Sequence, residues 1–443
     1  ETATFPRAAA TTNAASAASS LRPAPASSYS SESPDANCRP HTRLLFLLST
    51  SWGSSVMRGQ LAHSILSQQR HEPAQPRRVS SEVLWICSSC HRKPGYKMRP
   101  VLDALNASLG RAGGGQAVCV CVKFCHRAVA SLCAAHGAPT LWDVIDNFRL
   151  YERSVVQRAR LGFASAYAVQ TAAHAALLSQ WAGKPAVVLP HPHGNVGGWS
   201  TATRTRPSLR GVGFIYGDAS VNALSSSLVR RLARACCRAG ARLYLIFSPP
   251  AADTSAGSLR FQEQPCREPD GPELQRGHEC RGECATMPAD DSPPWPTERF
   301  RDDTGQRRFY ESERILELID VGLVWSGGVK LPRGFSGAQF FDAHRPPTRM
   351  HWWWSHGIPT LAMQLPTFRD AAERAGYPAA AVALRTPEDV EAALRSISCA
   401  PARECLRRAA LRGAAMSSPQ AASDDLVRAA CNLRQKVHSQ LGN

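Results

Sequence analysis

Three kinds of pattern are missing from this chain of 443 residues, and each absence excludes a class of protein. No apolar run approaches the roughly 20 residues that a membrane-spanning helix requires, and the run at 44–48 is far too short. No zinc-finger spacing occurs, and no platform of interleaved basic and aromatic residues marks a nucleic-acid-binding module. The glycine turn at Gly53 is not a complete Gly-x-Gly-x-x-Gly fingerprint, so a dinucleotide ligand is not implied.

Acidic residues are scarce relative to basic ones. The chain has 35 Asp and Glu against 52 Lys and Arg, which gives a formal net charge of +17. Such a balance suits anionic partners, including nucleotides, nucleic acid and membrane surfaces. The arginines are scattered, in pairs such as Arg230-Arg231 and Arg407-Arg408, instead of forming a long run. Nucleic acid is therefore the less favoured partner, and biased codon composition is another source of the charge.

The cysteines number fifteen, which is odd, and several of them lie in apolar runs: Cys87, Cys119, Cys121, Cys236 and Cys237. This pattern predicts small core residues in a reducing compartment. A CxxC followed by His at 87–91 resembles a haem-attachment or redox pattern. Cys280 and Cys284 lie near His278 and offer a second possible metal site. Both are minor alternatives, and we expect no metal and no cofactor.

The first 42 residues differ in composition from the rest of the chain. They are rich in Ala, Ser, Thr and Pro and contain few acids. We interpret residues 1–42 as a disordered tail or the remnant of a targeting segment, and composition cannot separate the two. The compartment is therefore undetermined: a reducing intracellular one is favoured, and organelle targeting is an alternative.

From residue 43 onward, apolar strands alternate with helices in a pattern typical of parallel α/β domains. In the first domain, residues 43–200, strands are expected at 44–48, 83–87, 117–122, 140–148 and 186–189. Helices are expected between them at 56–66, 98–109 and 129–136, and an Ala-rich helix ends near Gly183. A linker follows at 201–208.

A second domain, residues 209–400, restarts the pattern. Its expected elements are a strand at 211–217 with a glycine turn, a helix at about 225–239, a strand at 242–247, a helix at 310–318 and a strand at 319–325. Residues 249–308 are polar and Pro-rich and predict a disordered insertion. Thr386 is expected to cap a helix, and helices fill 401–443. The predicted fold class is α/β, with two doubly wound Rossmann-like domains, a disordered N-terminal tail and a polar insertion.

In doubly wound domains, ligands bind outside the carboxyl ends of the strands. The first strand ends in a small-residue turn that contains Trp52 and Gly53, with Arg58 on the next helix. Asp143 and Asp146 lie at the end of the fourth strand, where a structural or capping role is the alternative to ligand binding. These positions predict a ligand site at the edge of the first sheet.

The segment Pro190-His-Pro-His-Gly-Asn195 forms a rigid loop after a strand. Its two histidines, His191 and His193, suit a general base, a contact to phosphate or to a sugar hydroxyl, or a metal site. A metal would need third and fourth ligands that the sequence does not identify. A structural turn is the remaining alternative.

The segment 341–361 organises the second domain. Thr348 is a predicted N-cap, Arg349 to Ser355 form about two helical turns, and Gly357 ends the helix in the left-handed conformation. The N-terminus of this helix, with Arg345 and Arg349 beside it, predicts a site for phosphate or carboxylate. The alternative is a surface helix whose tryptophans fill a core.

The order of these segments resembles that of GT-B glycosyltransferases, in particular the large retaining family 4 group, in which the acceptor domain precedes the nucleotide-sugar domain. Residues 142–146 resemble the family's YDxxD strand, and 188–195 resemble the end of its first domain. Residues 211–217 resemble the opening of the donor domain and 319–325 its "aDvgllPS" strand. Residues 345–360 resemble its P-x-K-xx-E-xx-A-x-G-x-P-V segment. The resemblance spans roughly residues 43–440, apart from the insertion.

The chain departs from the family pattern at several positions. The paired glutamates that hold the donor's sugar and ribose correspond to His344 and Trp352. The family lysine corresponds to Arg349, which can still meet phosphate. The Arg and Lys that usually follow the first donor-domain turn are not evident at 218–222. These departures leave open whether the family chemistry is altered or lost.

Taken with its residues, the resemblance implies a glycosyltransferase that moves a sugar from a nucleotide-sugar donor to an unknown hydroxyl acceptor on a glycan, lipid or protein. No metal is implied, because protein cations replace it in GT-B enzymes. The alternative is a catalytically inactive relative that binds a glycan or nucleotide. The expected catalytic residues are His191, His193 and Asp146; the donor-binding residues are Gly217, Arg345, Thr348, Arg349, Trp352 and Gly357; the acceptor-binding residues are Trp52, Gly53 and Arg58.

Overall fold

In the computed structural model, the described residues all belong to one unit, 34–443. They are 38, 41–48, 56–69, 79–86, 98–112, 116–145, 161–193, 206–218, 226–248, 260–263, 316–325 and 346–441. Across these ranges, no helix combines the length and the apolar character that a bilayer crossing requires.

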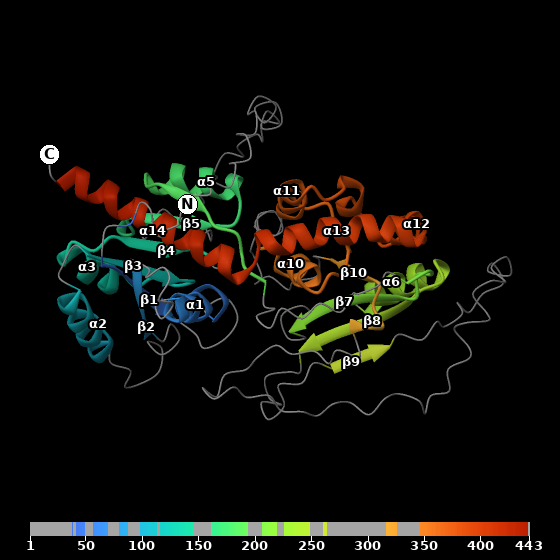
Figure 1. The fold of residues 1–443 in the computed structure, drawn as a ribbon, viewed down its shortest axis with the longest axis horizontal. Helices are drawn as coiled ribbons and strands as arrows, with labels where there is room; N and C mark the ends of the chain where they lie inside the picture. The colour runs from blue at the N-terminus through green and yellow to red at the C-terminus, as the bar shows by residue number, and fades with distance from the viewer. Residues whose placement is uncertain are drawn as a thin grey trace, which may run out of the picture. The chain divides into compact units, whose positions relative to one another are not determined.

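The first six strands form one fully parallel sheet in the order β2-β1-β3-β4-β5-β6 (Figure 1). They are β1 (Thr42–Leu48), β2 (Val79–Trp85), β3 (Ala117–Val122), β4 (Thr140–Asp143), β5 (Ala166–Val169) and β6 (Ala186–Val188). The central strands β1 and β3 are apolar on both faces, as parallel strands covered by helices must be. Because β2 and β3 lie on opposite sides of β1, the strand order reverses between β1 and β3.

Two apolar clusters cover the two faces of this sheet. Alternate residues of β1 enter different clusters, with Leu44 and Phe46 in one and Leu45 and Leu47 in the other, as the period of two in a strand requires. The helical segments of this half are η1 (Val56–Gln60, a π-helix), α1 (Leu61–Gln69), α2 (Arg99–Arg111), α3 (Arg127–Ala135), η4 (Leu161–Phe163) and α5 (Ala172–Ala182).

The second sheet has the order β11-β10-β7-β8-β9. Its strands are β7 (Gly211–Asp218), β8 (Arg242–Ser248), β9 (Arg260–Glu263), β10 (Val321–Val324) and β11 (Thr360–Ala362). Four of these strands run parallel, and β9 pairs with β8 in the antiparallel sense. The predicted α/β class with two doubly wound sheets is confirmed. Strand β9 lies within the predicted insertion 249–308, and the other residues of that insertion lie outside the described ranges, so its predicted disorder stays a prediction.

Trp353 fills a socket in the second sheet, from helix α10 (Thr348–Ser355). Gly213 of β7 and Gly322 of β10 are register partners. A Cβ on either glycine would lie 2.3 or 2.4 Å from the indole ring of Trp353. Only a glycine pair leaves room for this ring on the sheet, so these two glycines have a packing role. The tryptophans thus supply the core that the alternative interpretation of this helix expects.

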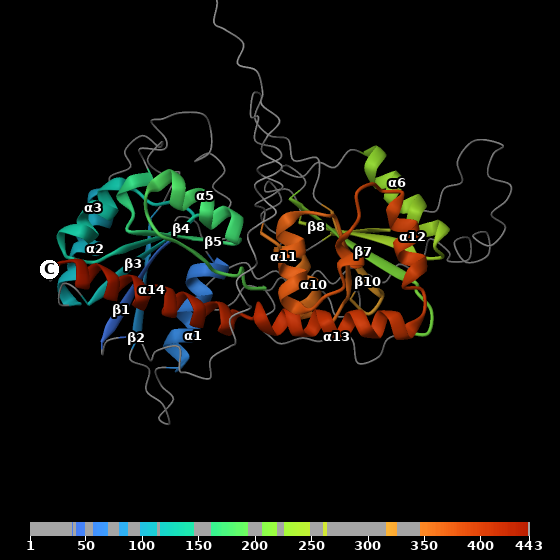
Figure 2. The ribbon, with the colours of Figure 1, turned by 90° about the horizontal axis from the view of Figure 1, so that it is seen from above.

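The helices of the second half are α6 (Ser226–Arg238), α10, α11 (Pro366–Ala375), η7 (Ala379–Val382), α12 (Asp389–Ser396), α13 (Ala400–Met416) and α14 (Pro419–Leu441). Helix α13 packs against α10 and α11 (Figure 2). Helix α14 instead contacts α1 and contributes Leu426, Val427 and Ala430 to a cluster on the first sheet. The last two helices therefore stabilise different halves of the chain.

Several predicted element ends are wrong; strand β2, for example, covers Val79–Trp85 instead of 83–87. Helix α10 begins at Thr348, and its N-cap is Pro347, which has no side-chain acceptor, so Thr348 is not the N-cap. Helix α12 begins at Asp389 instead of after Thr386, because the Asp389 carboxylate accepts from the backbone N–H of Thr386 and stabilises a turn there. Strand β4 ends at Asp143 instead of at residue 148.

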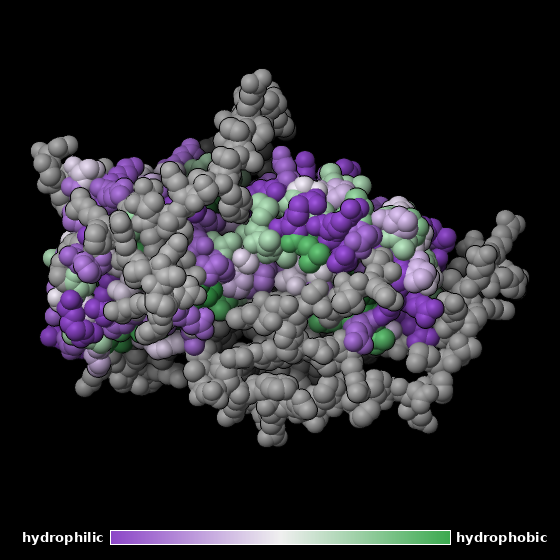
Figure 3. Space-filling view, in the orientation of Figure 1, coloured by the Kyte–Doolittle hydropathy of each residue, from purple (hydrophilic) through white to green (hydrophobic). Residues whose placement is uncertain are grey.

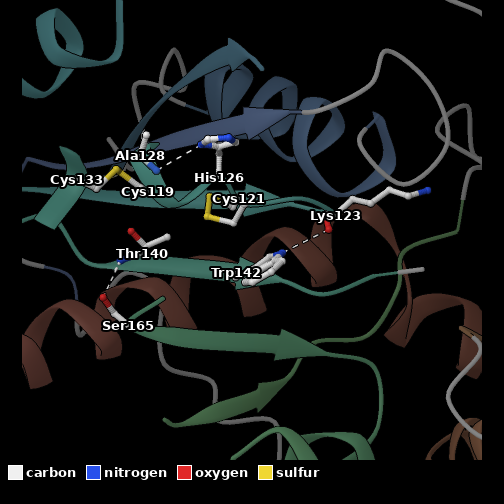
Figure 4. The surroundings of a disulfide bond; sticks show 10 residues. Cys119, Cys121, Lys123, His126, Ala128, Cys133, Thr140, Trp142 and Ser165 are labelled. Carbon is white, nitrogen blue, oxygen red and sulfur yellow. Dashed lines mark hydrogen bonds between the residues drawn. A yellow bond between two sulfur atoms is a disulfide. The ribbon is translucent and has the colours of Figure 1, made fainter. Parts of the chain in front are cut away.

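The expectation of unpaired core cysteines needs correction. Among the described residues, disulfides join Cys38 to Cys431, Cys119 to Cys133 and Cys121 to Cys125. Figure 4 shows the bridge between Cys119 of β3 and Cys133 of α3. Cys236 is a buried thiol, as expected. The free thiol of Cys236 agrees with the predicted reducing compartment. The three disulfides instead favour an oxidising compartment, because disulfides form and persist there.

Candidate functional site

The carboxyl edge of the second sheet is one of the two places where the topology predicts a ligand. The chain runs from β7 to β8 on one side and later to β10 on the other, so the strand order reverses between β7 and β10. Arg349, in the first turn of α10, donates from Nη1 to the carbonyl oxygen of Trp325 at 3.5 Å, directly after β10. This half-buried guanidinium therefore lies at the reversal point.

Two other residues that were predicted to bind the donor belong to the same region: Trp352 lies in α10 and Gly357 follows it. Trp352 is half-buried, with its ring 4.8 Å from that of Trp353 and 4.4 Å from that of His356, so its indole belongs to an aromatic cluster. Gly357 follows the helix with a φ of 69°, which confirms the left-handed ending. The role of Trp352 in donor binding stays a prediction.

Gly217 does not form the expected turn. Strand β7 continues through it to Asp218, and the pairing of β7 with β8 is irregular between Ile215 and Gly217. Gly217 therefore lies within a strand, next to an irregularity of its pairing, instead of in a turn. Its role in donor binding remains a prediction.

The carboxyl edge of the first sheet is held by a buried ion pair. Arg58, in η1, donates to both carboxylate oxygens of Asp143 at the end of β4, at 2.7 and 3.1 Å. Its Nη1 also donates to the carbonyl oxygens of Leu189 and Pro190, which follow β6. The guanidinium of Arg58, predicted to bind the acceptor, thus joins η1, the end of β4 and the loop after β6. The side chain of Arg58 is only 4% exposed.

Both histidines of the loop after β6 are buried. His191 donates from Nδ1 to the carbonyl of Pro192 at 2.8 Å. Burial, with the Arg58 charge as a smaller cause, lowers the pKa of His191 to about 3. Burial lowers the pKa of His193 to about 4. Both rings are therefore neutral near pH 7, and a base with so low a pKa is weak. The surroundings of these two histidines favour a hydrogen-bonding role over general-base catalysis. Their catalytic role stays a prediction.

The loop after β6 contacts the helix of the second sheet directly. His351, on α10, donates from Nδ1 to the carbonyl of His191 at 2.9 Å. The backbone N–H of His193 donates to the carbonyl of Ser417, between α13 and α14, at 2.9 Å. The structure thus brings α10 together with residues 190–193, called the PHPH loop from here on. Both segments were predicted as site segments from separate sequence patterns.

Several predicted residues lie outside the described ranges: Trp52, Gly53, Asp146 and Arg345. Conversely, sequence reasoning missed His351 and the paired role of Asp143 and Arg58. Both signals are weak in the sequence, because the partners are 160 and 85 positions apart. The close packing at Gly213 and Gly322 could have been predicted from the sequence. Each glycine lies among apolar residues of a strand, and a glycine in a strand often marks a close approach of another group.

A small cavity of about 10 Å³ lies beside Arg58, with Met57, Pro192 and Ser423 among its lining residues. This volume holds a single water and no sugar. The hydroxyl of Ser423 is buried and has no hydrogen-bond partner among the described residues. Within those same ranges, no three His, Cys, Asp or Glu side chains converge as ligands of a metal ion.

No family model and no curated protein matches the sequence. Solved structures do resemble the chain. An α,α-trehalose 6-phosphate synthase of Burkholderia multivorans is 10% identical, with a TM-score of 0.47, over 91% of this chain and 98% of that one. Anabaena HepE, solved with UDP, is 10% identical with a TM-score of 0.45, over 90% and 99%. MnaA of S. aureus, also solved with UDP, is 9% identical with a TM-score of 0.40, over 87% and 95%.

Likenesses at these scores carry no argument about chemistry. The fold is instead defined by the two sheets, the first parallel and the second parallel except for β9. The contacts of Arg349, Arg58 and His351 define the candidate site.

Proposed function

We propose that this chain is a glycosyltransferase that moves a sugar from a nucleotide-sugar donor to a hydroxyl acceptor. The observation that supports it most is the contact of Arg349 with the carbonyl after β10, at the strand-order reversal of the second sheet. The contact of α10 with the PHPH loop adds to it, because it joins the edges of two Rossmann-like sheets. Such edges are where doubly wound sheets bind ligands.

The residues of α10 have a chemical role in this proposal. When a sugar leaves its nucleotide, negative charge grows on the diphosphate, and cations aimed at it lower the barrier. Arg349 supplies a charged fork of donors. The first N–H groups of α10 have no partner within the helix and add partial positive charge. Arg345 is proposed to join them. No metal is needed in this scheme, and the acceptor is a glycan, lipid or protein of unknown identity.

The main rival is a catalytically inactive protein that binds a nucleotide or glycan. The burial of His191 and His193, which makes both rings weak bases, favours this rival. The two glutamates that hold the donor in the family are replaced here by His344 and Trp352, which also favours the inactive rival.

A thermal-shift screen across UDP-, GDP- and ADP-sugars tests the proposal first. The best donor is then titrated by calorimetry and incubated with the protein, and release of the free sugar or nucleotide is followed. A stabilising donor that is also turned over supports the transferase. Binding without turnover supports the inactive rival, and a screen in which no nucleotide sugar raises the melting temperature contradicts both.

Nucleic-acid binding is the less favoured alternative. The exposed arginines of α6 include Arg230, Arg231 and Arg234, and the surface drawn over α6 and α12 is largely hydrophilic (Figure 3). Two acids offset this charge: Glu388, the N-cap of α12, pairs with Arg231 at 2.7 Å, and Glu391 of α12 lies 3.6 Å from Arg238. The face is therefore of mixed charge. Binding of DNA or RNA that weakens steeply with salt would favour this alternative.

A further inference from the structure

Asn106 is the one asparagine of the chain that is followed by any residue but proline and then by Ser or Thr, in the sequence Asn106-Ala107-Ser108. This triplet is the acceptor motif for N-linked oligosaccharide. The asparagine lies on α2 and is exposed. We propose that Asn106 carries an N-linked oligosaccharide in the mature protein, in a compartment where the disulfides of the chain form.

The folded surface has room for a glycan at this position. The Oδ1 of Asn106 accepts from His136 Nε2 at 2.7 Å, which orients the amide and leaves Nδ2 as the atom to be modified. One turn before, the side chain of Asp103 is 59% exposed. One turn after, a Cβ added at Gly110 would meet no described atom within 4 Å. The face of α2 around Asn106 is therefore open on both sides.

The third residue of the motif shows when the modification takes place. Ser108 is only 1% exposed, and its hydroxyl donates to Glu82 Oε1 at 2.8 Å. An enzyme cannot read that hydroxyl once α2 has packed on the sheet. The oligosaccharide must therefore be added before this part of the chain folds, and the folded protein then keeps it on the exposed Asn106.

The disulfides are an independent observation in favour of this site. The Cys38–Cys431 bridge joins residues 393 positions apart, and both cysteines are nearly fully buried. Disulfides of this kind form and persist in oxidising compartments. Secreted proteins mature in such a compartment, and asparagine motifs are modified there.

The chemistry balances without an oxidant or reductant. The Nδ2 of Asn106 forms a bond to the anomeric carbon of an oligosaccharide carried by a lipid diphosphate. The bond from that carbon to the diphosphate oxygen breaks, and the lipid diphosphate leaves with the electron pair. One amide proton is released.

The test is to express the full chain in insect cells behind a cleavable secretion leader and to map its peptides by mass spectrometry. The peptide with Asn106 is compared with and without a peptide-N-glycosidase, which converts a modified asparagine to aspartate. Mapping without reductant reports the Cys38–Cys431 bridge in the same sample. Asn106→Gln keeps an amide for His136 but removes the acceptor, and Ser108→Thr keeps the motif.

We expect glycan on the wild type and on Ser108→Thr, none on Asn106→Gln, and the Cys38–Cys431 bridge in all three. Comparison of melting temperatures confirms that Asn106→Gln is folded. An unmodified Asn106 in chain that carries the Cys38–Cys431 bridge would overturn the proposal. Unpaired Cys38 and Cys431 in the secreted protein would overturn it as well, because the argument for the compartment would be lost.

Discussion

The two sheets place one arginine each near the carboxyl ends of their strands, and the two arginines have different surroundings. Arg58 is buried and makes a bidentate ion pair with Asp143. Arg349 is half-buried and its guanidinium reaches a backbone carbonyl at 3.5 Å. The sequence analysis assigned both to ligands. The structure shows that Arg58 holds three segments of the protein together, whereas Arg349 remains a candidate for ligand binding.

This difference has a physical basis. A buried cation must be compensated within the fold, because the effective cost of taking an ion out of water is several kcal/mol. A half-buried cation keeps part of its hydration and can exchange it for a phosphate. Removing the partner of Arg58 should therefore change the stability of the protein, and removing Arg349 should change ligand binding.

The largest effect is expected at the buried pair. Asp143→Ala leaves the charge of Arg58 uncompensated inside the fold, so we expect the free energy of unfolding to fall by about 3–5 kcal/mol. Urea unfolding followed by circular dichroism measures this change. The double variant Arg58→Met with Asp143→Leu, which removes both charges, should recover most of the loss.

The exposed pair of Arg231 and Glu388 is the matched control, since it has the same bidentate geometry at the surface. Glu388→Ala should leave the free energy of unfolding close to that of the wild type, because an ion pair at the surface is screened by water. Equal losses for Asp143→Ala and Glu388→Ala would show that the Arg58 pair does not differ from a surface ion pair, and the comparison of the two arginines would fail.

A smaller effect is expected at the socket of Trp353. A Cβ on Gly213 would lie 2.3 Å from the indole ring, so Gly213→Ala should lower the free energy of unfolding by about 1–3 kcal/mol through overpacking. Gly110→Ala is the control: its Cβ would meet no described atom within 4 Å, and alanine favours the helix by up to about 1 kcal/mol. Combining Gly213→Ala with Trp353→Phe should cost less than the two separate losses added together, and simple additivity would contradict the socket.

The contact between the two sheets should make stability depend on pH. Burial lowers the pKa of His351 from 6.5 to about 3. The hydrogen bond to the carbonyl of His191 opposes this shift, and Arg374, His191 and His193 are smaller causes that lower the pKa further. Below about pH 6.5 the unfolded chain binds more protons than the folded one, so stability is lost as pH falls toward the folded pKa. One such group contributes about 1.4 kcal/mol per pH unit.

Urea unfolding at several pH values between 7 and 5 measures this slope. His351→Gln should reduce it by the contribution of one group, while Met350→Leu, a conservative change at the neighbouring buried position, should leave it unchanged. If wild type and His351→Gln lose stability equally over this range, then His351 does not titrate as the geometry requires.

The fold was largely predictable from the sequence because its central strands are apolar on both faces. The runs 44–48 and 117–122 could pack in no other way than between layers of helices, and both are strands. Gly357 was predictable because a left-handed helix ending favours glycine. Strand β9 was missed because its four residues carry no apolar run in the sequence.

The site was less predictable because it depends on contacts between distant parts of the chain. Nothing local to Cys38 indicates Cys431, and nothing local to Arg58 indicates Asp143. The predicted cap of α10 was also wrong: Thr348 has a side chain that suits an N-cap, but the preceding Pro347 occupies that position. In each case the local pattern was compatible with several structures, and tertiary contact decided among them.

The most direct test of the central claim is the affinity of Arg349→Ala for a nucleoside diphosphate, measured by isothermal titration with UDP, GDP and ADP. We expect a loss of about 1.5–3 kcal/mol, typical of a hydrogen bond to a charged group, which is about 10- to 150-fold in the dissociation constant. Arg230→Ala, an exposed arginine on α6, should bind as the wild type does. Wild-type affinity in Arg349→Ala would contradict a donor site at the start of α10.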